Sequence, residues 1–321
     1  KSPNPARMYS TSCAPLRPSP SSRRATHAGS WYSSRRDQLA AQMSGWLEQA
    51  NACTGAARAV IAPHAGFSYS GPTAAWAYKH VSPTGIRRVF VLGPSHHHSM
   101  SRCAVSSCAT YETPFGGIPV DRATSAALLE TGAFDVMDLS VEEAEHSIEM
   151  HLPYILHVMG ATSFELVPIL VGALDEAAEA RYGALLAPHL LCAENLWVVS
   201  SDFCHWGRRF RYTRYDAAEG AICQSIEALD RRAMGLIEAQ DARGFAAYLR
   251  ATSNTICGRH PIALLLHALE NSSFSLQFVR YAQSSSVYTM DDSSVSYASA
   301  VVWEDRGDQQ ALEPRTHIPT D

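Results

Sequence analysis

Histidine and aspartate side chains follow three short apolar runs of this chain. The runs at 59–63, 89–92 and 196–201 lead to His64, to the histidine triplet at 96–98, and to Asp202 and His205. Imidazole and carboxylate groups bind metal ions and transfer protons, and in open α/β sheets such groups meet at the carboxyl ends of the strands. The sequence therefore predicts a chemical site at one edge of a sheet.

The histidines also have purely structural interpretations. A single loop histidine such as His64 often makes hydrogen bonds that only stabilise its loop, but the equivalent position of His96 after a neighbouring run favours a shared function. In an extended chain alternate side chains point to opposite sides, so His96 and His98 can share a side while His97 turns away. We assign the function to His96 because it lies nearest to the strand end.

Cys257 is the third candidate ligand. A lone cysteine is commonly a small buried apolar residue. A metal ion, or the neighbouring Arg259 and His260, would instead stabilise its thiolate and make it a ligand or a nucleophile. Two imidazoles and a thiolate favour copper, iron or zinc over magnesium or calcium.

Two further groups of polar residues accompany these candidates. Asp202 and His205 have the spacing of a carboxylate that orients an imidazole, or of an imidazole that moves protons beside a metal, although Asp202 alone could be a helix cap. The segment 145–153 contains Glu145 and His146; in a helix Glu145 and Glu149 would share a face, but the segment lacks the His-Glu-x-x-His order of zinc peptidases. We expect this segment to support the pocket wall, with His146 lining it.

Several classes of function are disfavoured. The chain has no Gly-rich phosphate loop and no Gly-x-Ser-x-Gly turn, which argues against phosphoryl transfer, nicotinamide chemistry and serine hydrolysis. The formal net charge is −5 and no basic stripe alternates with aromatic residues, so we do not expect nucleic acid as a partner. No apolar stretch approaches the roughly 20 residues of a membrane span.

Strand and helix patterns alternate between the two ends of the chain. This order predicts a single α/β domain whose central, largely parallel or mixed sheet is covered by helices on both faces. Pro168 lacks an N–H for a sheet ladder, so we place its strand near an edge or at a bulge. The predicted strands cover 58–63, 89–92, 164–171, 196–201, 276–281 and 295–303. The predicted helices cover the segment after Ser33 or Ser34 up to Leu47, 73–79, 125–129, 175–190, 217–228, 233–239 and 244–249.

The two ends of the chain differ from this core in composition. Residues 1–26 are rich in Pro, Ser and Arg and predict a disordered extension, while 304–321 predict a polar tail around a domain at 27–303. The extension lacks the apolar core of a secretory signal. The absence of acidic residues before Asp37 would allow a mitochondrial presequence, but the weak amphipathic pattern and several prolines disfavour one, so we do not expect it. Eight cysteines without a C-x-x-C pair indicate reduced thiols, so we expect a cytoplasmic protein, with a nuclear location left open.

At these motifs the sequence closely resembles the Memo family, named for a mediator of receptor-driven cell motility. The resemblance extends over 27–303 and leaves out only the two ends. The matching segments are 27–32, 61–66, 92–97, 145–153, 200–207, 255–261, 281–285 and 292–297.

The resemblance implies a fold similar to class III extradiol dioxygenases and a metal pocket built from His64, His96 and Cys257, with Asp202 and His205 lining it. His98 stands where the animal pattern has Val, which again places the metal role on His96. The related enzymes hold iron with two histidines and a carboxylate, and the softer thiolate here shifts the preference toward copper. We therefore expect one copper or iron ion per chain, with zinc less favoured. Ring-cleaving dioxygenase activity is therefore not expected from the fold.

Two functions of different classes follow from the resemblance. The first is a metal-dependent redox protein that passes electrons to dioxygen or a small redox partner and supports cytoskeletal signalling and cell motility. The second is a non-catalytic adaptor that binds a phosphotyrosine peptide in the same pocket. For stacking and phosphate contacts the sequence offers Trp31, Tyr69 and Arg259, which can equally be ordinary core and surface residues.

Overall fold

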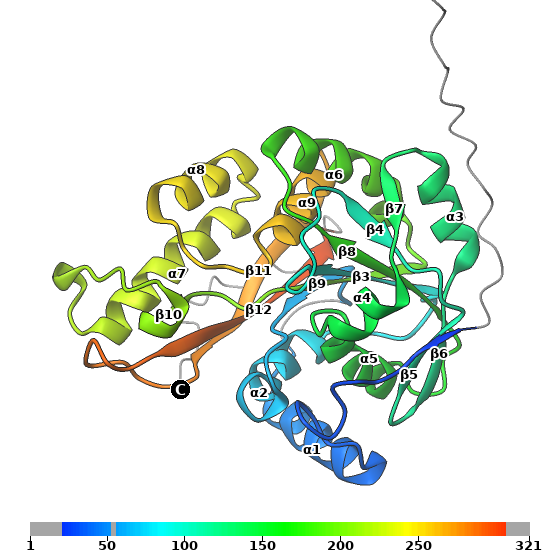
Figure 1. The fold of residues 1–321 in the computed structure, drawn as a ribbon, viewed down its shortest axis with the longest axis horizontal. Helices are drawn as coiled ribbons and strands as arrows, with labels where there is room; N and C mark the ends of the chain where they lie inside the picture. The colour runs from blue at the N-terminus through cyan, green and yellow to red at the C-terminus, as the bar shows by residue number, and fades with distance from the viewer. Residues whose placement is uncertain (1–20, 53–55, 306–321) are drawn as a thin grey trace, which may run out of the picture.

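The parallel strands that carry the candidate residues lie side by side in the centre of one large sheet. The computed structural model describes residues 21–52 and 56–305, and within them this sheet has nine strands (Figure 1). Strands β2, β9, β3 and β8 are mutually parallel, and β12 and β4 flank them in antiparallel orientation. In spatial order the strands are β10 (His205–Trp206), β12 (Ser294–Glu304), β2 (Ala59–Ala62), β9 (Asn195–Ser200), β3 (Arg88–Pro94), β8 (Glu165–Val171), β4 (Cys103–Val105) and β7 (Phe134–Val136), with β11 (Phe274–Gln283) paired to β12. The prediction of a mixed, centrally parallel sheet is confirmed.

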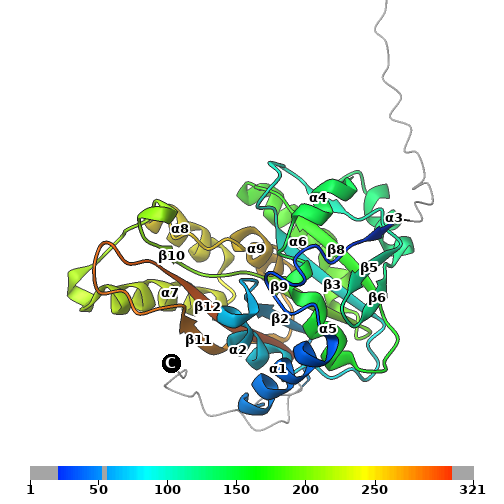
Figure 2. The same cartoon turned by 60° about the horizontal axis from the view of Figure 1, so that its bottom comes forward.

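Each central strand contributes side chains to two hydrophobic cores. In β3, Val89 and Val91 belong to one core and Phe90 and Leu92 to the other, as the period of two in a strand requires. One face carries α3 (Arg122–Glu130), α6 (Glu176–Leu191), α7 (Ile222–Glu238), α8 (Ala242–Thr252) and α9 (Arg259–Leu269). The other carries α1 (Arg36–Gln49), α2 (Phe67–Tyr78) and α5 (Leu152–Met159) (Figure 2), and α4 (Leu139–Ala144) packs Val141 against the same core. Helices therefore cover both faces, as predicted.

The domain begins earlier than the sequence predicted. Strand β1 (Ser22–Arg23) pairs with β5 (Thr110–Thr113), which pairs with β6 (Gly116–Pro119) in a three-stranded sheet. The Arg23 side chain is 1% exposed and forms an ion pair with Glu149, so the boundary predicted at residue 27 is wrong by about one short strand. The rest of the predicted extension, 1–20, and the tail from 306 lie outside the described residues.

Pro168 does not lie at a sheet edge, because β8 is paired on both sides. The carbonyl of Leu166 accepts from the N–H of Asp121. Residues two apart in a strand direct their backbone groups to the same side, so the backbone nitrogen of Pro168 faces the side of Asp121 and not β3. The pairing with β4 begins only at Ile169, which leaves the missing N–H of Pro168 without a required ladder partner.

The predicted helices are present with one change, and three helices, α4, α5 and α9, were not predicted. The segments 217–228 and 233–239 form a short 3₁₀ turn (Ala217–Glu219) followed by one continuous helix, α7. Helix α9 was not predicted, because its central residues are apolar on all sides and show no helical period. No helix in the described part of the chain is both long enough and apolar enough to cross a membrane.

Candidate metal centre

The ends of three neighbouring strands and the start of one helix bring the candidate residues together. His64 follows β2, His96 follows β3, and Asp202 follows β9, which lies between these two strands in the sheet. Cys257 lies two residues before α9 begins. The predicted convergence at the carboxyl edge of the parallel strands is present.

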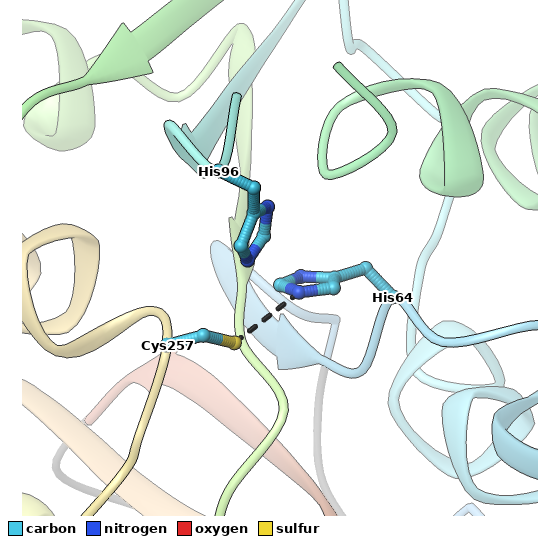
Figure 3. Close-up of side chains that lie close together, drawn as sticks. All are labelled: His64, His96 and Cys257. Atoms are coloured by element: carbon cyan, nitrogen blue, oxygen red, sulfur yellow. Dashed lines mark hydrogen bonds between the residues drawn. The ribbon is translucent and has the colours of Figure 1, made fainter. Parts of the chain in front are cut away.

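His64, His96 and Cys257 point toward one another (Figure 3). One potential ligand atom from each lies within 4.8 Å of the other two, and His64 Nε2 is 3.2 Å from Cys257 Sγ. The three residues come from segments that are far apart in the sequence, so the cluster is produced by the fold. His64 is 2% exposed, whereas His96 lies nearer to the surface.

Hydrogen bonds determine which nitrogen of His64 carries the hydrogen. The hydroxyl of Ser200 donates its only hydrogen to the carbonyl of Ser147 at 2.7 Å. It can therefore only accept from His64 Nδ1, which lies 2.6 Å away. Nδ1 carries the hydrogen, and the Nε2 lone pair faces Cys257. Burial, followed by the charges of nearby histidines, lowers the pKa of His64 well below its usual value, so the ring is neutral.

His96 is oriented in the same way by a charged partner. Its Nδ1 lies 2.9 Å from Glu145 Oε1 and its backbone N–H donates to Glu145 Oε2 at 2.6 Å. Burial alone would raise the pKa of Glu145, but the hydrogen bonds from His96 and from the Ser147 N–H outweigh it and lower the pKa to about 2. The carboxylate is ionised and can only accept, so Nδ1 carries a hydrogen, and Nε2 is the nitrogen whose lone pair the neutral ring offers.

The position of Cys257 depends on a close approach of backbone. A Cβ on Gly258 would lie 2.3 Å from the carbonyl oxygen of Ser200, so only glycine lets the start of α9 pack against the end of β9. The Asp202 N–H donates to Cys257 Sγ at 3.2 Å. Burial and the Asp202 charge nevertheless raise the pKa of the thiol well above its usual value, so the sulfur needs a cation nearby to lose its proton.

The residues present fit a soft or borderline metal ion. Metal bonds of about 2.0–2.1 Å to nitrogen and about 2.3 Å to sulfur place tetrahedral ligand atoms roughly 3.3–3.6 Å apart. The observed separations reach this range with small side-chain movements. Two neutral imidazole nitrogens and one sulfur suit copper, iron or zinc and not magnesium or calcium.

Asp202 and His205 lie beside the ligand cluster without being part of it. Asp202 Oδ1 accepts a hydrogen bond from the backbone N–H of His64 at 2.8 Å. No helix begins at Asp202, so its carboxylate is not a helix cap and instead holds the loop that carries His64. Burial raises the pKa of Asp202, and the neighbouring His205 opposes this rise. His205 Nδ1 lies 2.9 Å from the carbonyl of Phe203, so this nitrogen donates and Nε2 stays available.

Aromatic rings form a wall beside His96. The His146 ring stacks on the His96 ring, with 4.5 Å between the ring centroids. It also contacts the Trp31 ring, again with 4.5 Å between the centroids. Burial lowers the pKa of His146 to about 3. Trp31 is 37% exposed, and Tyr69, at the start of α2, is 62% exposed. Trp31 and His146 thus lie beside His96. Tyr69 lies near Tyr297, whose pKa is raised first by burial and then by the charges of Asp202 and Tyr69.

The placement of Arg259 in this pocket was wrong. Arg259 is the first residue of α9, and its side chain lines a separate cavity of about 280 Å³ together with Phe245 and Glu179. Because α9 begins at Arg259, the side chains of Cys257 and Arg259 point to different sides. Another arginine, Arg209, has its guanidinium 4.4 Å from the centroid of the Phe210 ring, and its charge opposes the rise that burial causes in the pKa of Tyr297.

The segment 145–153 is not one helix. Glu145 directly follows α4, residues Glu149–His151 form a 3₁₀ turn, and α5 begins at Leu152. Glu145 and Glu149 therefore contact different partners, and the Ser147 hydroxyl donates to the carbonyl of Pro94. Ser200, which orients His64, was missed; a serine at the end of an apolar strand carries no pattern that indicates this contact.

Known proteins match most of the chain. The family model described as Memo-like protein matches residues 23–301. Protein MEMO1 of Danio rerio is 50% identical over 287 residues, which is 87% of this chain and 97% of that protein. Protein MEMO1 of Homo sapiens is 49% identical with the same coverage, and the memo-1 homolog of Caenorhabditis elegans is 44% identical over 88% of this chain and 82% of its own length. An uncharacterized protein of Escherichia coli K12 overlaps with a TM-score of 0.46 at 14% identity, over 75% of this chain and 98% of its own.

Proposed function

This chain belongs to the Memo family, and we propose that it is a redox protein that holds one copper or iron ion between His64, His96 and Cys257. A bound ion of this kind exchanges single electrons with dioxygen and releases superoxide or a related reduced species. A reductant of the cell must then return the electron. We further propose that this activity supports cytoskeletal signalling and cell motility from the cytoplasm.

The observation that carries the proposal is the orientation of the two imidazoles. Both Nδ1 atoms donate to fixed partners, Ser200 and Glu145, and both Nε2 lone pairs lie beside the sulfur of Cys257. A histidine pair with a purely structural role has no need to present two unprotonated nitrogens to one thiol. The arrangement is the one that metal-binding histidines adopt, with the second ring nitrogen held by an outer partner.

The thiol distinguishes this centre from a ring-cleaving oxygenase. Non-haem iron oxygenases use two histidines and a carboxylate, whereas Cys257 supplies sulfur here. Sulfur favours copper over harder ions and is itself open to oxidation. We therefore propose one-electron chemistry, with zinc as the less favoured occupant and no cleavage of aromatic rings.

Two further residues have roles beside the ligands. His205 has its Nδ1 engaged by backbone carbonyls, so Nε2 is the atom that accepts or delivers a proton in the pocket. Asp202 holds the backbone of His64 and donates its own N–H to Cys257 Sγ. It thereby keeps two ligands from different segments in register.

Oxygen consumption tests the redox proposal. Protein loaded with one equivalent of copper or iron, and supplied with ascorbate, should consume dioxygen and yield superoxide that superoxide dismutase removes. Cys257→Ala should reduce the rate at least ten-fold, while Cys223→Ala, a matched change at a cysteine in α7, should not. Equal rates for the two variants and the wild type contradict the proposal.

A second function has one observation in its favour. Among the described residues, Arg209 has no carboxylate within 4 Å, whereas the adjacent Arg208 pairs with Asp291. An unpaired guanidinium beside aromatic rings suits an anionic aromatic group such as phosphotyrosine. An adaptor function predicts that Arg209→Ala weakens binding of a phosphotyrosine peptide at least ten-fold. It also predicts that Arg208→Ala and Cys257→Ala leave the affinity unchanged. If neither Arg209→Ala nor Arg208→Ala weakens peptide binding, this adaptor site is excluded.

A further inference from the structure

One short segment contains the outer partner of His96 and contacts the outer partner of His64. It consists of Glu145, His146 and Ser147, between α4 and the 3₁₀ turn at Glu149–His151, and we call it the 145–147 clamp. It approaches the end of β3 closely, because a Cβ on Gly93 would lie 2.5 Å from Ser147 Oγ. The segment therefore sits against the strand that leads to His96.

The first arm of the clamp is the Glu145 carboxylate. It accepts two hydrogen bonds from the same residue, one from the His96 ring at 2.9 Å and one from the His96 backbone N–H at 2.6 Å. This double contact fixes both the loop that carries His96 and the rotation of its ring. The negative charge also raises the basicity of the opposite ring nitrogen, which makes it a better ligand.

The second arm is the backbone carbonyl of Ser147. It accepts the Ser200 hydroxyl at 2.7 Å, which leaves Ser200 Oγ with lone pairs only for His64 Nδ1 at 2.6 Å. Without this carbonyl the hydroxyl could donate to His64 instead, and the hydrogen of the imidazole would move to Nε2. The position of one backbone oxygen thus decides which His64 nitrogen is free.

The two arms are joined by the carboxylate itself. Glu145 Oε1 also accepts from the backbone N–H groups of His146 and Ser147, at 3.0 and 2.9 Å. Ser147 Oγ in turn donates to the carbonyl of Pro94 at 2.8 Å. Glu145 therefore holds the backbone from which the second arm projects.

The same residues could be mistaken for a second metal site. Potential ligand atoms of His96, Glu145 and His146 lie within 4.8 Å of one another. The carboxylate, however, already accepts four hydrogen bonds, from the His96 ring and from the N–H groups of His96, His146 and Ser147. A carboxylate with these contacts orients its neighbours and is not free to bind an ion.

We propose that the 145–147 clamp sets the tautomers of His64 and His96 together, and that Glu145 is the positioning residue through which both present Nε2 to the metal. This inference rests on the proposed metal-binding function, which it deepens. Loss of Glu145 should then disturb His64 as well as His96, although Glu145 does not touch His64.

Glu145→Gln is the direct test, with Glu149→Gln as its matched control. Glutamine replaces one acceptor oxygen with an NH₂ group that opposes the N–H donors around it. Metal affinity should fall about 10- to 100-fold, as for other outer-shell partners. Glu149 is equally buried in the same region, but it binds Arg23, His27 and Tyr32 and neither metal-binding histidine, so Glu149→Gln should change the affinity less than three-fold.

The tautomers can be read directly by long-range ¹H–¹⁵N NMR of the histidine rings, with and without zinc as a diamagnetic probe. Wild-type protein should show hydrogen on Nδ1 of both His64 and His96 before zinc is added. Glu145→Gln should change both rings; Ser200→Ala should change His64 alone and provides the test if Glu145→Gln does not fold. An Nε2 hydrogen on either ring of the wild type, or a His64 signal unaffected by Glu145→Gln, overturns the clamp.

Affinity measured by competition of Co²⁺ with a chromogenic chelator separates the two proposals. A wild type that binds no metal contradicts the proposed function, and the metal-free NMR spectra still decide the clamp. Binding that Glu145→Gln and Glu149→Gln weaken equally contradicts the clamp and leaves the metal centre standing.

Discussion

The backbone N–H of His64 donates a 2.8 Å hydrogen bond to the side chain of Asp202, so the loops after β2 and β9 are tied to each other beside the metal pocket. The backbone N–H of Asp202 in turn donates to the sulfur of Cys257 at 3.2 Å. One residue thus contacts two proposed ligands and is not itself in the ligand cluster. Its role follows from these contacts: it positions the ligands.

Replacing Asp202 separates positioning from metal coordination. Asp202→Asn keeps one acceptor oxygen for the His64 N–H, so copper affinity should change less than ten-fold. Asp202→Ala leaves that buried N–H unpaired and should cost about 1–3 kcal/mol of stability together with a larger loss of affinity. Chelator competition and urea unfolding measure both quantities, and an equal loss of affinity in the two variants would indicate a direct ligand instead.

Gly258→Ala should damage the metal site through packing alone. The new Cβ would lie 2.3 Å from the Ser200 carbonyl oxygen and 2.4 Å from Ser201 Cβ. The start of α9 must then move away from β9 and take Cys257 with it, at a cost of about 1–3 kcal/mol. Metal affinity should fall at least ten-fold.

Gly235→Ala is the control for this change. Gly235 lies in α7, and a Cβ added there would enter open space, so alanine should leave metal binding intact and add up to about 1 kcal/mol of stability. Unchanged affinity in Gly258→Ala would show that the close approach to β9 does not position Cys257.

Glu149 should stabilise the fold in a pH-dependent way. Burial alone would raise its pKa, but hydrogen bonds from His27 and Tyr32 and the charge of Arg23 lower it to about 2. A carboxylate with a lowered pKa adds stability above its unfolded pKa of about 4.3, and this stability is lost as the pH falls toward 2. Glu149→Gln should therefore cost on the order of 3 kcal/mol at pH 7, with a smaller difference below about pH 4. A difference that stays constant in urea unfolding from pH 7 to pH 3.5 would refute this assignment.

Asp230 should show the opposite dependence. Burial raises its pKa to about 6 despite hydrogen bonds from Asn254 and Tyr281. The destabilising charge is absent below about pH 4 and develops as the pH rises through 6. Relative to the wild type, Asp230→Asn should gain on the order of 3 kcal/mol between pH 4 and pH 7. The same unfolding series tests this, and a flat difference across that range contradicts it.

The central strands and the positions of His64 and His96 could be predicted because they depend on local patterns, whereas Cys257 was indicated by its neighbours and by the family resemblance. Apolar runs such as the one before His64 give buried parallel strands, and the residue after each run necessarily lies at the carboxyl edge of the sheet. His64 and His96 lie at this edge, and Cys257 joins them from the start of α9, so the three residues meet as expected. The likeness to extradiol dioxygenases and the cytoplasmic location stay predictions.

The outer contacts could not be predicted, because they depend on how distant segments pack. The Ser147 carbonyl reaches Ser200 only because Gly93 and the segment after α4 allow a close approach. Arg259 was placed at the pocket because it follows Cys257 in sequence, but α9 begins at that residue and directs the two side chains apart. Ser147 and Ser200 are far apart in the sequence and in contact, whereas Cys257 and Arg259 are close in the sequence and face different surroundings.

Metal content is the most direct test of the central claim. Protein purified from its own cells should contain close to one copper or iron ion per chain by mass spectrometry, and His64→Ala and Cys257→Ala should each contain less than about a tenth of that. The control Cys223→Ala should match the wild type. Absence of both metals from the wild type, or full metal content in Cys257→Ala, would contradict a centre built from these three residues.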